Sequence, residues 1–131
     1  MAERVVIVEG VRTPIGRFGG TLKNVSSGFL AAHVITALLN KTGVHPEQVE
    51  EVILGEVRQT TESSNVARVA TIRAKLPVEV PAFTINRLCA SGMQAIASGV
   101  QQIQSGHAQI VIAGGTESMS NAPIYLRNSR F

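Results

Sequence analysis

The single cysteine of the chain, Cys89, is the residue with the clearest capacity for covalent chemistry. It stands in the segment NRLCASG, residues 86–92, where an apolar run passes into a helical pattern of small residues. A helix that begins here supplies free backbone N–H groups and the positive end of its dipole, which favour a thiolate. Ala90, Ser91 and Gly92 are small enough to let a substrate carbonyl approach the sulfur. Cys89 is therefore a candidate nucleophile.

A structural role for Cys89 is the competing interpretation. Unpaired cysteine is among the residue types most often buried, where it acts as a small hydrophobe. The position at a strand-to-helix junction weakens this alternative, because ligands of α/β sheets gather at the carboxyl ends of the strands. The two roles differ in the accessibility of the sulfur, which a nucleophile needs and a core thiol lacks.

The three histidines do not supply an obvious base for this thiol. His33 falls within a helical pattern, His45 precedes a proline in a turn, and His107 follows Gly106 at a helix end. None stands at a metal-ligand spacing from Cys89 or from a carboxylate, so we expect no metal site. The glycines after the first apolar run fit neither G-x-G-x-x-G nor a P-loop, which argues against a generic nucleotide-binding domain.

Four short apolar runs with helical patterns between them predict an α/β fold. The strands are expected over residues 4–10, 51–57, 80–88 and 108–115. The helices are expected from Ser26 or Ser27 to about Asn40, from Ser64 or Asn65 to the residue before Pro77, and from about Ala90 to Ser105, with a further helical turn after His45. Continuous β-branched runs such as VVIV are typical of parallel strands that are buried on both faces. We therefore predict a mainly parallel sheet with helices on both faces.

Composition limits the class of protein. The chain has 131 residues, 44% hydrophobic and 16% charged, which is enough for one globular domain. No apolar run approaches the roughly 20 residues that span a bilayer, so we expect no membrane segment. The net charge of +3 is spread without a basic cluster among aromatics, which argues against a nucleic-acid partner. One cysteine forms no internal disulfide, so we expect a reducing, cytoplasmic location.

Three segments together resemble one known family. NRLCASGMQAI resembles the acyl-enzyme segment of the thiolases, the family of acetyl-CoA C-acetyltransferases and 3-ketoacyl-CoA thiolases. VRTPIGRFGGTL near the start and AGGTESMSNAPIYL near the end are similar to further family segments, in the same order and at fitting distances. The resemblance extends over the whole chain. One departure is Thr116, where many thiolases carry methionine.

The resemblance implies acyl transfer between coenzyme A thioesters, by Claisen condensation or thiolytic cleavage, through an acyl-cysteine on Cys89. It implies no covalently bound cofactor, acyl-CoA thioesters as substrates, and a homo-oligomer, dimer or tetramer, in the parent protein. The family's base histidine in a G-H-P segment and its second catalytic cysteine do not occur in this sequence. We therefore expect a chain without turnover of its own.

The resemblance also implies an incomplete N-terminal half of the layered thiolase fold. Residues 1–118 would form an N-terminal α/β domain that lacks its last strand, and residues 119–131 would begin a loop region. A C-terminal domain would be absent. Two other functions stay open: a β-ketoacyl-synthase-like condensing enzyme, and a non-catalytic, truncated thiolase-like chain that serves in interactions.

Three polar residues near these motifs each have two open interpretations. Asn86 and Arg87 either brace the loop of Cys89 or a dimer contact, or they form an exposed polar turn. Glu117 either accepts backbone N–H bonds from neighbouring loops or is a plain surface acid.

Two further pairs of residues flank the same motifs. Phe18 and Met119 would suit the lining of an acyl pocket, although packing is the favoured role for both. Gly114 and Gly115 are expected to permit close backbone approach near Cys89 rather than to bind phosphate.

Overall fold

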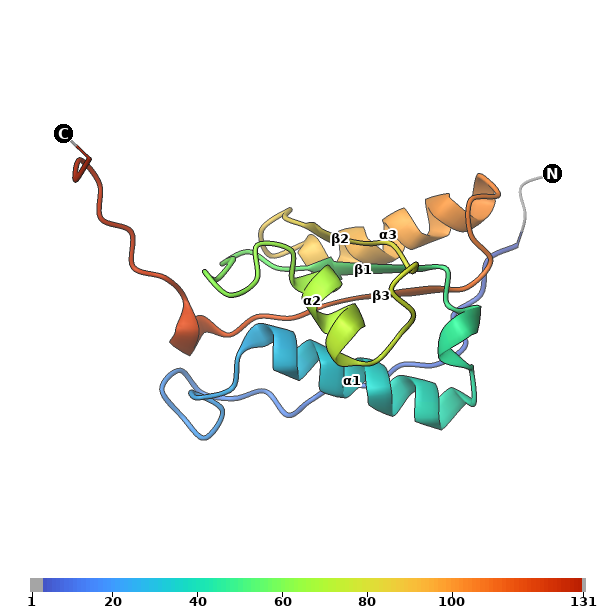
Figure 1. Ribbon diagram of the computed structural model, residues 1–131, viewed down its shortest axis with the longest axis horizontal. Helices are drawn as coiled ribbons and strands as arrows, with labels where there is room; N and C mark the ends of the chain where they lie inside the picture. Colours follow the sequence, from blue (N-terminus) through green and yellow to red (C-terminus); the bar gives the residue numbers. More distant parts are fainter. Residues whose placement is uncertain (1–3, 131) are drawn as a thin grey trace.

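The computed structural model describes residues 4–130, which form three layers with a parallel sheet in the middle (Figure 1). The sheet has the order β2-β1-β3, and its strands are β1 (Glu51–Gly55), β2 (Ala82–Ile85) and β3 (Val111–Gly115). The helices are α1 (Ser27–Thr42), α2 (Val66–Arg73) and α3 (Ser91–Gln104), with short 3-10 helices η1 (Pro46–Gln48) and η2 (Met119–Asn121). The predicted α/β class is confirmed, and the elements are mostly shorter than expected.

Alternate residues of the central strand face opposite helical layers, as the pleat of a strand requires. Val52 and Leu54 belong to the core that α1 and α2 cover, together with Ile112 of β3. Ile53 is level with Ala113 in the sheet and faces α3, and it has no exposed surface. Helices therefore cover both faces of the sheet, as predicted, and β1 is buried on both.

Local signals in the sequence set the helix ends. Gly43 ends α1 in the left-handed conformation, with φ 70°, where glycine has no steric cost. Asn65 precedes α2, and its side chain accepts the N–H of Arg68 at 3.2 Å. Ser26 occupies the N-cap position of α1, but its hydroxyl makes no capping bond. The prediction that the helix begins after Ser26 is therefore correct, but the capping hydrogen bond expected from its side chain does not form.

The predicted strand over residues 4–10 is wrong. This segment forms neither strand nor helix, and the side chains of Val6, Ile7 and Val8 are 63–79% exposed. No main-chain hydrogen bond joins residues 4–10 to another segment of the described chain. A β-branched run favours extended backbone, but a strand also needs a partner within hydrogen-bonding distance. Here the edge of β3 lies across a groove from the segment.

No helix within residues 4–130 has the length and apolar character needed to cross a bilayer.

Candidate active site

Cys89 lies on the short loop between β2 and α3, at the carboxyl edge of the parallel sheet. The residue is exposed. An exposed cysteine does not contribute to a core, so the interpretation of Cys89 as a buried structural thiol is wrong. The sulfur has no hydrogen-bond partner among residues 4–130.

The first turn of α3 leaves main-chain donors free beside Cys89. The N–H of Gln94 is the first to bond within the helix pattern, to the carbonyl of Ala90 at 2.8 Å. The N–H groups of Gly92 and Met93 have no acceptor in the part of the chain that the structure describes. Free N–H groups at a helix N-terminus can bind the oxyanion that forms when a thiolate attacks a carbonyl.

Glycines let the start of α3 lie almost in contact with the sheet. A Cβ added to Gly55 would lie 2.5 Å from the carbonyl carbon of Ser91 and 2.8 Å from the nitrogen of Gly92. A Cβ on Gly115 would lie 3.4 Å from the Cα of Gly92, whereas one on Gly114 would make only an ordinary contact at 3.8 Å. Close approach was thus predicted correctly for Gly115 and wrongly for Gly114. Gly55 was missed, although a glycine that ends a buried strand signals such an approach.

Two of the polar residues with open roles brace this site. The carboxylate of Glu117 accepts the N–H of Val57 at 2.8 Å and that of Arg58 at 3.1 Å. The side chain of Asn86 donates to the carbonyl of Val57 at 3.3 Å and accepts the N–H of Leu88 at 3.0 Å. The bracing interpretation is therefore correct for both residues.

The remaining polar candidate, Arg87, is exposed and its guanidinium donates to the side chain of Gln94.

The three histidines lie apart from Cys89. His33 is exposed in the middle of α1. His45 and His107 follow the C-terminal ends of α1 and α3. These two helix ends lie at the opposite edge of the sheet from the loop between β2 and α3 (Figure 1). Within residues 4–130 no cluster of three or more His, Cys, Asp or Glu side chains is placed to hold a metal ion.

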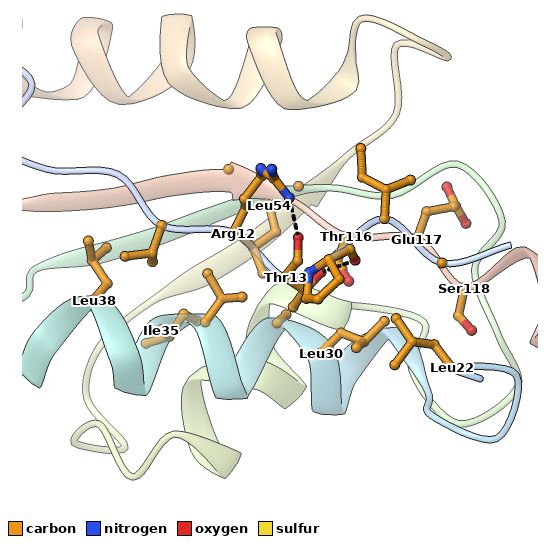
Figure 2. Close-up of a pocket in the computed structure, with 18 of the residues that line it drawn as sticks. Arg12, Thr13, Leu22, Leu30, Ile35, Leu38, Leu54, Thr116, Glu117 and Ser118 are labelled. Carbon is orange, nitrogen blue, oxygen red and sulfur yellow. Dashed lines mark hydrogen bonds between the residues drawn. The ribbon is translucent and has the colours of Figure 1, made fainter. Parts of the chain in front are cut away.

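A groove of about 410 Å³ lies between residues 9–18, α1 and β3, and Cys89 is not part of its lining (Figure 2). Its floor is apolar and includes Leu30, Ile35 and Leu38 of α1. Phe18 and Met119 also line it and are 81% and 51% exposed. Their favoured role in packing is therefore wrong, and the groove that they line does not include Cys89.

Glu56, directly after β1, is a buried carboxyl without a well-formed hydrogen bond. It is 1% exposed, and the hydroxyls of Ser26 and Ser27 are also buried and unpaired among the described residues. Burial raises the pKa of the Glu56 carboxyl, the nearby Ser27 hydroxyl offsets part of the rise, and the charge of Glu117 adds to it.

We expect the variant Glu56→Gln to be more stable than the unmodified chain at neutral pH, by about 1–3 kcal/mol, because the amide stays neutral whereas the buried carboxyl must either carry a charge or keep its proton. Because folding raises the pKa of Glu56, the folded state keeps its proton to a higher pH than the unfolded state does. The free energy of unfolding therefore falls as the pH rises from 4.5, the ordinary value, and levels off above the raised pKa. Urea unfolding at several pH values measures this slope.

The matched control for this experiment is Glu79→Gln, because Glu79 is exposed. Its pH profile should follow that of the unmodified chain. Burial also raises the pKa of Glu51, whereas the N–H of Gly10 lowers the pKa of Glu9, so a residual slope shared by all variants is subtracted before the profiles are compared. A Glu56→Gln profile identical to that of the unmodified chain would contradict the prediction.

Comparison with known proteins matches nearly the whole chain to one family. The model of the thiolase N-terminal domain matches residues 5–131. A probable acetyl-CoA acyltransferase of Staphylococcus epidermidis is 47% identical over 128 residues, which cover 98% of this chain and 32% of that protein. An acetyl-CoA acetyltransferase of Syntrophomonas wolfei is 47% identical over 131 residues, 100% of this chain and 33% of that protein.

A solved structure gives the same result for the fold. The crystal structure of the Bacillus anthracis acetyl-CoA acetyltransferase matches with a TM-score of 0.89 and 48% identity, over 92% of this chain and 31% of that chain. The chain thus spans about a third of the length of the curated relatives it matches. Since the family model covers all but the first four residues, the chain belongs to the thiolase family and corresponds to its N-terminal domain.

Proposed function

We propose that this chain is the N-terminal part of an acetyl-CoA acetyltransferase, in which Cys89 carries the acyl group between coenzyme A thioesters. The observation that carries the proposal is that Cys89 is exposed in the loop that leads directly into α3, whose first turn has free N–H groups. The names of the Staphylococcus and Syntrophomonas relatives support the substrate class. The same steps serve Claisen condensation in one direction and thiolytic cleavage in the other.

The first half-reaction exchanges one thioester for another. The Cys89 thiolate attacks the carbonyl carbon of an acyl-CoA, and the electrons of the C=O double bond move to the oxygen. The N–H groups of Gly92 and Met93 are available to bind this oxyanion. The intermediate then expels coenzyme A as a thiolate and leaves the acyl group on the sulfur.

The second half-reaction requires a base, which removes an α-proton from a second acyl-CoA in the direction of condensation. No basic side chain bonds to Cys89 within residues 4–130, and the histidines lie elsewhere. We therefore expect the chain by itself to accept an acyl group on Cys89 without sustained turnover.

Acetylation of Cys89 tests the proposed function directly. The folded chain, incubated with acetyl-CoA, should gain the mass of one acetyl group, and peptide mapping should place it on Cys89. Cys89→Ala should gain none. The chain unfolded in urea keeps the thiol and loses the site, so it should react no faster than free cysteine. Equal rates for the folded and unfolded chain would show that the fold does not activate the sulfur.

That negative result would favour the non-catalytic alternative, a thiolase-like chain that serves in interactions. No feature of the geometry favours the β-ketoacyl-synthase-like alternative, and the relatives reported above are acetyl-CoA acyltransferases. The expected role in fatty acid metabolism and the cytoplasmic location stay predictions.

We also infer that residues 1–118 form a domain that lacks one strand, and that the groove beside α1 is where that strand binds. Residues 4–14 make no main-chain hydrogen bond to another segment of the described chain. On the other side of the groove, β3 pairs only with β1 among residues 4–130, so within that range its outer edge has no partner strand. A strand between these two segments would pair with both and cover the apolar floor of the groove.

Unpaired strand edges and exposed apolar side chains predict that the chain self-associates, as the expected homo-oligomer of the parent protein also requires. Light scattering should show an average mass that rises with concentration. Ile15 lines the groove and is 91% exposed, so Ile15→Lys should raise the concentration needed for association about tenfold, because a charge on an exposed apolar surface opposes its burial against a second copy.

Val78→Lys is the matched control, because Val78 is 66% exposed and lies outside the groove. It should associate as the unmodified chain does. A single monomeric peak at all concentrations would count against the prediction.

A further inference from the structure

The loop that carries Cys89, residues 86–91, holds a backbone conformation that its own sequence does not favour. Leu88 has φ 50°, in the left-handed region that bulky residues avoid. Its side chain is 68% exposed, so packing of that side chain does not impose the conformation. Hydrogen bonds from neighbouring residues must hold it.

The first restraint on Leu88 comes from Ser91, at the start of α3. The hydroxyl of Ser91 accepts the N–H of Arg87 at 2.8 Å and donates to the carbonyl of Leu88 at 2.6 Å. Ser91 is 5% exposed and lies against the backbone of Gly55. One buried hydroxyl therefore bonds both the N–H of Arg87 and the carbonyl of Leu88, the two residues that precede Cys89. It makes no bond to Cys89 itself.

The second restraint comes from Asn86, at the start of the loop. Its side-chain oxygen accepts the N–H of Leu88 at 3.0 Å, while its amide nitrogen donates to the carbonyl of Val57 at 3.3 Å. Asn86 thus ties the loop to the segment after β1, which is 29 residues away along the chain.

The anchor of that segment is Glu117, which follows β3. Its carboxylate accepts the N–H groups of Val57 and Arg58. A continuous set of hydrogen bonds therefore runs from the end of β3, through the segment after β1, to the N–H of Leu88. Each member lies at the carboxyl edge of the sheet.

We infer that Ser91, Asn86 and Glu117 are positioning residues, which hold Leu88 in the left-handed conformation and so direct the Cys89 side chain. The inference rests on the proposed acyl transfer, and none of the three residues needs to touch the substrate. A change in the φ angle of Leu88 swings the next residue relative to the start of α3. Cys89 would then lose its placement relative to the first turn of that helix, which carries the free N–H groups.

Hydrogen exchange and acetylation of the whole chain test the inference together. The Leu88 amide should exchange slowly in the unmodified chain and fast in Asn86→Ala, and Asn86→Asp should restore slow exchange because it keeps the acceptor oxygen. The rate of acetylation by acetyl-CoA should fall about tenfold in Asn86→Ala and about a hundredfold when Ser91→Ala is added, since misplacing a nucleophile has effects of this size.

Glu117 is tested by a graded pair of variants. Glu117→Gln keeps one acceptor oxygen and should lower the acetylation rate less than Glu117→Ala does. Both should speed the exchange of the Val57 and Arg58 amides. Rates are compared under conditions where circular dichroism shows every variant folded, so that loss of stability does not imitate loss of position.

The matched controls are Asn40→Ala, on the exposed face of α1, and Gln101→Ala, at an exposed position of α3 away from the loop. Both should acetylate as the unmodified chain does. Variants at Asn86 and Ser91 that acetylate at the unmodified rate would overturn the positioning role while the proposed function stands. If the unmodified chain takes no acetyl group, the proposed function is wrong, and unchanged Leu88 exchange in Asn86→Ala would then overturn the restraint as well.

Discussion

Replacing Gly55 with alanine should lower the free energy of unfolding by about 3 kcal/mol, the upper part of the range for overpacked sites. The added Cβ would lie 2.5 Å from the carbonyl carbon of Ser91 and 2.6 Å from its Cβ. These are backbone and near-backbone atoms, which cannot rotate away, so the start of α3 must lift from the sheet. Urea unfolding measures the loss.

The same substitution should also slow the acetylation of Cys89. Ser91 holds the loop, and Gly92 carries one of the free N–H groups, so displacement of either moves the candidate oxyanion site. We expect the rate to fall by at least about tenfold, in line with the sensitivity of reaction rates to misplacement.

Gly92→Ala is the matched control for the stability measurement. A Cβ on Gly92 would have nothing within 4 Å, and the residue lies in the first turn of α3. Alanine has the higher helix propensity, so this variant should be as stable as the unmodified chain or more stable, by up to about 1 kcal/mol. A Gly55→Ala variant with unmodified stability would show that α3 and β1 are not packed as closely as the structure places them.

Replacing Ile53 with alanine should lower the free energy of unfolding by about 2–5 kcal/mol, the usual cost of a large-to-small change in a core. Ile53 has no exposed surface and lies on the side of β1 that faces α3. That helix presents small residues to the sheet, Ala95 and Gly99, which have no side-chain length with which to fill the cavity. Denaturant unfolding with circular dichroism measures the effect.

Ile96→Ala is the control, since Ile96 belongs to α3 and is 42% exposed. It removes the same atoms from a site that water already reaches, so the loss should be less than half that of Ile53→Ala. Similar losses for the two variants would mean that α3 does not cover β1 as described.

Several features of the fold were predictable because they depend on residues close in sequence. The left-handed end of α1 at Gly43 and the cap of α2 by Asn65 each involve bonds within four residues. The central strand, predicted over residues 51–57 and observed over Glu51–Gly55, was recognisable from its continuous apolar run, which reflects burial on both faces. Such signals are local, so the sequence carries them without reference to the rest of the fold.

The candidate site was predictable in part. Cys89 was placed correctly at a strand-to-helix junction, and its segment indicated the family that the comparisons confirm. The sequence could not decide whether Glu117 braces neighbouring loops or is a surface acid, because its bonding partner Val57 lies 60 residues away along the chain. The close approach of Gly55 to Ser91 was missed, since it depends on how near α3 lies to the sheet.

The sequence by itself determined the end of α1, the start of α2, the central strand, the position of Cys89 and the family, because each depends on short-range patterns or on matched segments. Only the tertiary structure decided that residues 4–10 are not a strand and that three separate segments hold the Cys89 loop. The physical reason is that strand pairing and these side-chain bonds join residues far apart in the chain. Their partners are set by the packing of the layers, which no local pattern encodes.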